Sequence, residues 1–104
     1  MTFYENIDAP ERVLLISVDT GDFNAEESIE ELVLLVETAG GEAVVTSTQK
    51  LPSVNPATYV GSGRIQEIAE ICRTSEIDLI VADDELSPAQ LKNIEDLTDT
   101  RVID

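Results

Sequence analysis

Short apolar runs alternate with amphipathic stretches along the chain, and this alternation predicts an α/β fold. The apolar runs are rich in β-branched and aliphatic residues, and the first of them, RVLLISV, is apolar enough to be buried on both faces of a sheet. The predicted strands are residues 12–18, 42–48, 77–82 and 100–104. Between them, apolar residues recur at helical spacing, which predicts three intervening helices.

The first helix has local signals at both ends. Asn24 and Glu27 have the spacing of a capping box, so we expect a helix from Ala25 to Ala39. Gly40 and Gly41 follow it, as glycines commonly follow helix C-termini. Its apolar stripe is Ala25, Ile29, Leu32, Val36 and Ala39.

The other two helices follow a long loop and a short one. A loop over residues 49–62 precedes the second helix, which begins at Ser62 or Gly63. Residues 87–90 (SPAQ) combine a capping serine, a proline at the first helical position and a glutamine box partner. We expect the second stripe to be Ile65, Ile68, Ala69 and Cys72, and the third inner face to be Leu91, Ile94 and Leu97.

The order β-α-β-α-β-α-β predicts an open, mostly parallel four-stranded sheet with helices on both faces. We expect one α/β domain over residues 12–104, preceded by a polar, acidic N-terminal extension over residues 1–11. The extension lacks the basic and apolar regions of a signal peptide. No apolar run reaches the ~18 residues that span a membrane, so we expect a cytoplasmic location and no membrane partner.

The composition adds a strongly acidic charge. There are 22 acidic and 6 basic residues, a net charge of −16, and the basic residues are scattered. Broad binding to nucleic-acid phosphates is therefore unfavourable in dilute salt. Either the domain does not touch nucleic acid, or it works in a salty cytoplasm, where about 1 M salt shortens the Debye length to about 3 Å. The spread of acids over every segment favours the second, halophilic interpretation.

The cysteine and histidine counts limit metal chemistry. With one cysteine and no histidine, the chain has no internal disulfide and lacks the usual zinc ligands. An oxygen-liganded metal such as Mg²⁺ remains open. Cys72 falls on an apolar stripe, so we expect it to be a small buried hydrophobic residue.

The long loop ends in a pair of glycines at a helix N-terminus. Free backbone amides at such a terminus can hold an anion, and Arg64 would add a positive charge. The alternative is a glycine turn that only leads the chain into the helix. The phosphate-binding loop G-x-x-x-x-G-K-[ST] is absent, so we expect the chain alone to be non-catalytic. The expected anion- or RNA-facing residues are Thr58, Tyr59, Gly61, Gly63 and Arg64.

Carboxylates follow two of the predicted strands. Asp83, Asp84 and Glu85 come after the third strand and Asp19 after the first, so all should emerge at the carboxyl edge, where α/β proteins usually bind ligands. Asp19 and Asp83 are candidate Mg²⁺ ligands. This pattern leaves open an accessory domain that binds or hydrolyses ATP or GTP. In so acidic a chain, a chance placement at this edge is the alternative.

Leu34 lies nearly opposite the stripe of the first predicted helix, at 100° per residue. We therefore expect it to point away from the sheet. A single exposed leucine is ordinary, and docking of another domain is the alternative.

Three segments and the chain end together resemble the HflX family of ribosome-associated GTPases. Residues 28–41 (SIEEL through TAGG) resemble the family's "SLEEL … TAG". Residues 55–64 (NPATYVGSGR) resemble "P-x-T-Y-[IV]-G-x-G-K", and residues 83–95 (DDELSPAQLKNIE) resemble "D-x-E-L-S-P-x-Q-x-R-N-L-E". Residues 101–104 (RVID) are similar to the stretch before "R-T-x-L-I-L-D-I-F". The resemblance covers residues 12–104.

The resemblance implies a parent GTPase that uses GTP and Mg²⁺ and binds the large ribosomal subunit and its rRNA. This domain would help to position a helical segment and a GTPase domain, neither of which this sequence contains, and would itself hold no cofactor. Arg64 stands where the family has lysine, and Lys92 where it has arginine. Both keep the charge, but Lys92 lacks the bidentate geometry of arginine.

Overall fold

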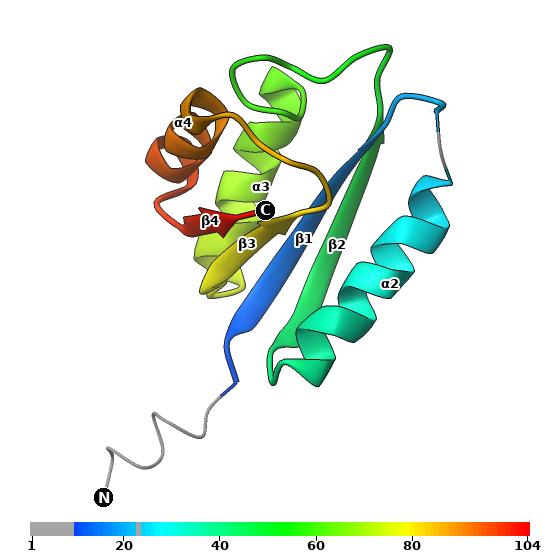
Figure 1. The fold of residues 1–104 in the computed structure, drawn as a ribbon. Helices are drawn as coiled ribbons and strands as arrows, with labels where there is room; N and C mark the ends of the chain where they lie inside the picture. Colours follow the sequence, from blue (N-terminus) through cyan, green and yellow to red (C-terminus); the bar gives the residue numbers. More distant parts are fainter. Residues whose placement is uncertain (1–9, 23) are drawn as a thin grey trace, which may run out of the picture.

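The computed structural model describes residues 10–22 and 24–104. Residues 1–9 of the predicted N-terminal extension, and Phe23 of the turn before the first helix, lie outside the described residues. The elements alternate as predicted (Figure 1). They are β1 (Arg12–Asp19), α2 (Ala25–Thr38), β2 (Glu42–Lys50), α3 (Ser62–Thr74), β3 (Leu79–Ala82), α4 (Pro88–Thr98) and β4 (Arg101–Ile103).

The four strands form one sheet in the order β2-β1-β3-β4, and all three strand pairings are parallel. β1 lies at the centre, where Ile16 is opposite Ser47 of β2 and Ala82 of β3. Because the strands are parallel, their carboxyl ends share one edge of the sheet. The loops that follow β1, β2 and β3 therefore all begin at that edge.

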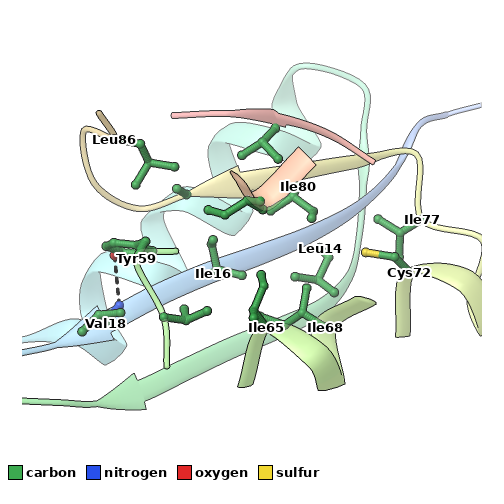
Figure 2. Packing of buried hydrophobic residues seen from close by; sticks show 14 residues of the cluster. Leu14, Ile16, Val18, Tyr59, Ile65, Ile68, Cys72, Ile77, Ile80 and Leu86 are labelled. Atoms are coloured by element: carbon green, nitrogen blue, oxygen red, sulfur yellow. Dashed lines mark hydrogen bonds between the residues drawn. The ribbon is translucent and has the colours of Figure 1, made fainter. Parts of the chain in front are cut away.

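The helices cover both faces of the sheet, which confirms the predicted α/β fold. Alternate residues of β1 point to opposite faces. Leu14, Ile16 and Val18 belong to a core with α3 and α4 (Figure 2), whereas Val13 and Leu15 pack with α2. One face thus carries two helices and the other carries one (Figure 1).

The predicted capping signals are confirmed at two helices. The Asn24 side chain accepts a hydrogen bond from the Glu27 amide at 3.1 Å. Ser87 and Gln90 form a reciprocal capping box at the start of α4. Local side-chain chemistry therefore fixes where α2 and α4 begin.

Several boundaries and one helix face differ from the prediction. β2 continues through Lys50, and β3 begins only at Leu79. The inner face of α4 was predicted to include Leu97, but Leu97 is 54% exposed and Thr98 is buried instead. Thr98 is tolerated there because its hydroxyl donates to the Ile94 carbonyl at 2.7 Å. Cys72 is buried and free, as predicted.

None of the helices within the described residues is long and apolar enough to cross a membrane.

Candidate functional site

The loop between β2 and α3, residues 51–61, begins at the carboxyl edge of the sheet and carries the predicted site motif (Figure 1). Within it, Asn55 and Tyr59 pair in an antiparallel bridge, each donating its amide to the carbonyl of the other, at 3.0 and 2.8 Å. The Asn55 side chain also accepts from the amides of Ala57 and Thr58. The loop is therefore a closed, internally bonded turn.

Tyr59 anchors this turn to the sheet. It is 1% exposed, and its hydroxyl oxygen accepts a hydrogen bond from the Val18 amide at 3.0 Å (Figure 2). β3 ends at Ala82, opposite Ile16, so Val18 lies beyond the reach of that strand. The tyrosine hydroxyl takes the place of the missing strand partner. The backbone of Tyr59 has a φ of 65°, in the left-handed region that non-glycine residues seldom occupy.

Burial also changes the acidity of this tyrosine. The pKa of Tyr59 is raised to about 12, mainly because burial disfavours the charged phenolate. The hydrogen bond from Val18 opposes this rise, and the negative charges of Asp84 and Asp83 add to it. Tyr59 is therefore neutral at physiological pH. It acts as a buried hydrogen-bond acceptor in the core.

α4 holds the turn from the other side. The Gln90 side chain is buried, and its Nε2 donates to the Asn55 carbonyl at 2.9 Å while its Oε1 accepts from the Ser87 amide. Asn93 Nδ2 donates to the Ala57 carbonyl at 2.9 Å. The motif at residues 55–64 and the motif at residues 83–95 therefore build one structure.

The N-terminus of α3 opens from this turn. Gly61 is its N-cap residue, and the Gly61 amide donates to Gln49 Oε1 of β2 at 2.9 Å. A Cβ at Gly61 would lie 3.0 Å from Gln49 Nε2. The next amides, from Ser62 onward, have no partner within the helix, because the first turn of any helix leaves its N–H groups free. This terminus is a potential anion site.

Arg64 is bound to β2. Its Nη1 donates to Ser47 Oγ at 3.0 Å and to the Thr48 carbonyl at 3.4 Å, and its Nε lies 3.7 Å from Glu67. The side chain remains 30% exposed. Arg64 therefore joins α3 to β2, and its side chain is only partly accessible to a ligand.

The structure divides the predicted loop residues into two groups. Thr58 and Tyr59 are 8% and 1% exposed, so their side chains do not take the solvent-facing positions expected from the sequence. They are buried because Thr58 Oγ1 donates to the Val60 carbonyl and the Tyr59 hydroxyl caps β1. Gly61, Gly63 and Arg64 remain at the surface or partly exposed.

Three of the four predicted carboxylates at the carboxyl edge of the sheet have hydrogen-bond partners within this domain. Asp19 Oδ1 accepts from the Gly21 amide at 2.8 Å, and Asp84 Oδ1 accepts from the Glu85 amide at 2.9 Å. Asp83 lies 3.5 Å from the Ser17 hydroxyl. In the described part of the chain, no three acidic, histidine or cysteine residues gather as a metal site would require. Asp19 is the last residue of β1, and Asp83 is the first residue after β3, so the two lie at the ends of neighbouring strands.

Sequence reasoning missed the residues that hold the loop: Gln49, Asn55 and Asn93 had no assigned role, and Gln90 appeared only as a capping residue. All four are amides, which both donate and accept and so can join two backbone segments. Their signal was present in the two motifs, which contain Asn55, Gln90 and Asn93. Only the fold shows that these motifs touch.

Comparisons with known proteins agree on one family. The family model described as "GTP-binding GTPase N-terminal" matches residues 26–104. The protein named GTPase HflX from Lacrimispora saccharolytica is 50% identical over 97 residues, which cover 90% of this chain and 22% of that protein. The proteins of the same name from Flavobacterium psychrophilum and Escherichia coli are 38% and 36% identical, over 90% and 97% of this chain.

The chain spans about a quarter or less of the length of these relatives: 22% for the first and 24% for each of the other two.

Proposed function

Since the chain belongs to the HflX family of GTPases and corresponds to its N-terminal domain, we propose that it is a binding and positioning module. In the full-length cytoplasmic protein it helps to place a helical segment and a GTP- and Mg²⁺-binding domain on the large ribosomal subunit. In this proposal the chain itself holds no cofactor. Its contact with the ribosome is made by the start of α3 and the turn before it.

The observation that carries this proposal is Gly63. Its φ is not positive, and a Cβ added there would meet no atom within 4 Å. The fold therefore gives no reason for glycine at this position, although glycine in a helix is less favourable than alanine by about 0.5–1 kcal/mol. Close approach of a ligand to the backbone is one of the reasons for which glycine is used, and it requires neither a positive φ nor a crowded Cβ position.

The ligand chemistry follows from the helix terminus. Free amides and the positive end of the helix dipole favour an anion, and rRNA phosphates are anions. Arg64, one residue on, adds a partly exposed positive charge. Asn55, Gln90 and Asn93 hold the turn in place, so that little conformational freedom is lost on binding.

The test is Gly63→Ala in the full-length protein, measured by co-sedimentation with large ribosomal subunits in molar KCl. We expect at least tenfold weaker binding, because the added methyl keeps phosphate away from the amides. The free energy of unfolding should stay equal or rise by up to about 1 kcal/mol. Arg64→Ala should weaken binding in the same direction, and Arg73→Ala, at the far end of α3, is its control for loss of positive charge alone. Equal binding of Gly63→Ala and the native protein would rule out this contact.

The acidic surface determines how the proposed binding to the ribosomal subunit depends on salt concentration. At a net charge of −16 the domain repels phosphates in dilute salt, and molar salt screens that repulsion. We therefore propose that the protein is salt-adapted, as a halophilic protein is. Binding to the subunit should then strengthen as KCl rises, which is the reverse of the usual salt dependence.

The alternative, a domain that binds or hydrolyses ATP or GTP at the carboxyl edge, has less support. Asp19 and Asp84 each use a carboxylate oxygen within their own turns, and the chain has no phosphate-binding loop. Isothermal titration with ATP and GTP in the presence of Mg²⁺ tests it. Magnesium-dependent heat would favour the alternative over the positioning role.

A further inference from the structure

α2 is apolar on more than the side that faces the sheet. Residues 32–36 read LVLLV, and five consecutive apolar residues extend around most of a helix. Leu32, Val33 and Val36 pack on the sheet, but Leu34 and Leu35 are 64% and 66% exposed. Over these five residues α2 is apolar nearly all round, whereas a surface helix ordinarily carries its apolar residues on one side.

An apolar groove lies beside α2 on the same face of the sheet. α2 packs on β1 and β2, and among the described residues no other helix shares this face, whereas α3 and α4 together cover the opposite one (Figure 1). The groove has a volume of about 530 Å³. Its apolar lining comes from α2 and its C-cap residue, and from β1, β3 and β4; it includes Val13, Leu35, Val36, Leu79, Val81 and Ile103.

β4 shows why the groove remains open. Val102 points into the core with α3 and α4, so its neighbours Arg101 and Ile103 point to the face of α2. Ile103 is 44% exposed and lines the groove. The sheet therefore presents apolar side chains to a position where no described element of this chain lies.

The length of the relatives indicates what fills it. The matched proteins are more than four times as long as their aligned segments, and the matching family model is that of an N-terminal domain. In these proteins the polypeptide continues after the counterpart of β4, which borders the groove. A nearby segment of the same chain can therefore reach the groove through a short connection.

The handedness of the fold indicates the path. β1-α2-β2 steps one way across the sheet with its helix on one face, and β3-α4-β4 steps the other way with its helix on the opposite face, as right-handed crossovers require. A helix that turns back from β4 over β3 with the same handedness lies on the face of α2. It runs antiparallel to the strands and alongside α2.

We propose that the segment after residue 104 of the full-length protein forms an amphipathic helix that fills the groove between α2 and β3–β4. Its apolar side covers Leu35 and Ile103, and Leu34, on the outer side of α2, stays exposed. The inference rests on membership of the family and not on ribosome binding, so either can fail without the other.

The test compares thiol labelling of two single variants of the full-length protein, Leu35→Cys and Leu34→Cys. The two positions are adjacent and almost equally exposed in this domain, but only Leu35 lines the groove. We expect Leu35→Cys to react at least tenfold more slowly than Leu34→Cys. Ile103→Cys is a second variant, and we expect it to be protected in the same way. The native protein is the background, because Cys72 is buried.

Two outcomes would overturn the proposal. Equal labelling of Leu35→Cys and Leu34→Cys would show an open groove. Protection of Leu35→Cys that disappears on hundredfold dilution would show that a second copy of the protein fills the groove. Protection that persists on dilution, without added ribosomes, would support the proposed helix.

Discussion

At the scale of single residues, Tyr59 shows how a loop side chain can belong to the core. β1 has eight residues and β3 has four, so the end of β1 lacks a strand neighbour on one side. The Tyr59 hydroxyl accepts the amide hydrogen of Val18 that the short β3 leaves unpaired. A buried, unpaired amide costs about 1–3 kcal/mol, so this single contact matters for stability.

The first prediction concerns Tyr59→Phe. At neutral pH we expect the free energy of unfolding to fall by about 1–3 kcal/mol, because the Val18 amide loses its acceptor. The folded-state pKa of Tyr59, about 12, lies above its ordinary value of 10.0. The tyrosine's stabilising contribution is therefore complete below about pH 10 and declines as the pH rises toward about 12.

Urea unfolding of the native protein and the Tyr59→Phe variant, at several pH values from about 7 to about 12, measures this. The difference in stability should narrow by about 2–3 kcal/mol over the alkaline range, at about 1.4 kcal/mol per pKa unit. Ionisation of lysines affects both proteins and cancels in the difference. A difference that does not change with pH would contradict the buried, neutral state of Tyr59.

At the scale of elements, α4 supports the loop before α3. Gln90 uses one end of its amide to cap α4 and the other to hold Asn55. The start of one helix and the loop that leads into another are therefore joined through one buried side chain. Any rigidity of the proposed ribosome contact depends on this connection.

Gln90→Glu separates the two roles, because a carboxylate keeps the acceptor for the Ser87 amide but loses the donor to Asn55. We expect the cap of α4 to persist while the Asn55–Tyr59 bridge loosens. In hydrogen exchange, the Tyr59 amide should exchange at least tenfold faster than in the native protein. Gln66→Glu, at an exposed position on α3, is the matched control. Unchanged exchange at Tyr59 would show that the loop holds itself.

The elements also show what could be predicted from the sequence. The starts of α2 and α4 were predicted because Asn24 and Ser87 act on amides three residues away. The prediction for the inner face of α4 was partly wrong. Thr98 lies in the core in place of Leu97, because its hydroxyl donates a hydrogen bond to the Ile94 carbonyl of the same helix. The burial of Tyr59 depends on the unequal lengths of β1 and β3. No local pattern records that difference.

At the scale of the whole molecule, charge is the dominant feature. The described residues contain five ion pairs, all at the surface, and each exposed pair contributes about 0–1 kcal/mol. Most acidic residues in this part of the chain have no cationic neighbour, and α2 has acids in its first turn and no base in its last. Mutual repulsion of the acids therefore opposes the compact state.

We expect the free energy of unfolding to rise with KCl between about 10 mM and 1 M, as the Debye length falls from about 30 to about 3 Å. Circular dichroism and urea unfolding measure the change. The matched variant Glu30→Gln/Glu31→Gln/Glu37→Gln should show a smaller salt dependence, because it removes three negative charges from α2. Identical spectra and unfolding curves in dilute and molar salt would contradict salt adaptation.

The strand order has a consequence for synthesis of the protein. β1 is made first and lies at the centre, and its two neighbours are β2 and β3. β3 begins at Leu79, which lies opposite Val13 of β1. The chain from Leu79 onward must therefore leave the ribosome before β1 can pair with β3, its second neighbour. Contacts so distant in sequence form late. During translation, the strand with the largest number of apolar residues therefore has one edge unpaired, and the nascent chain is most prone to misassociation before β3 emerges.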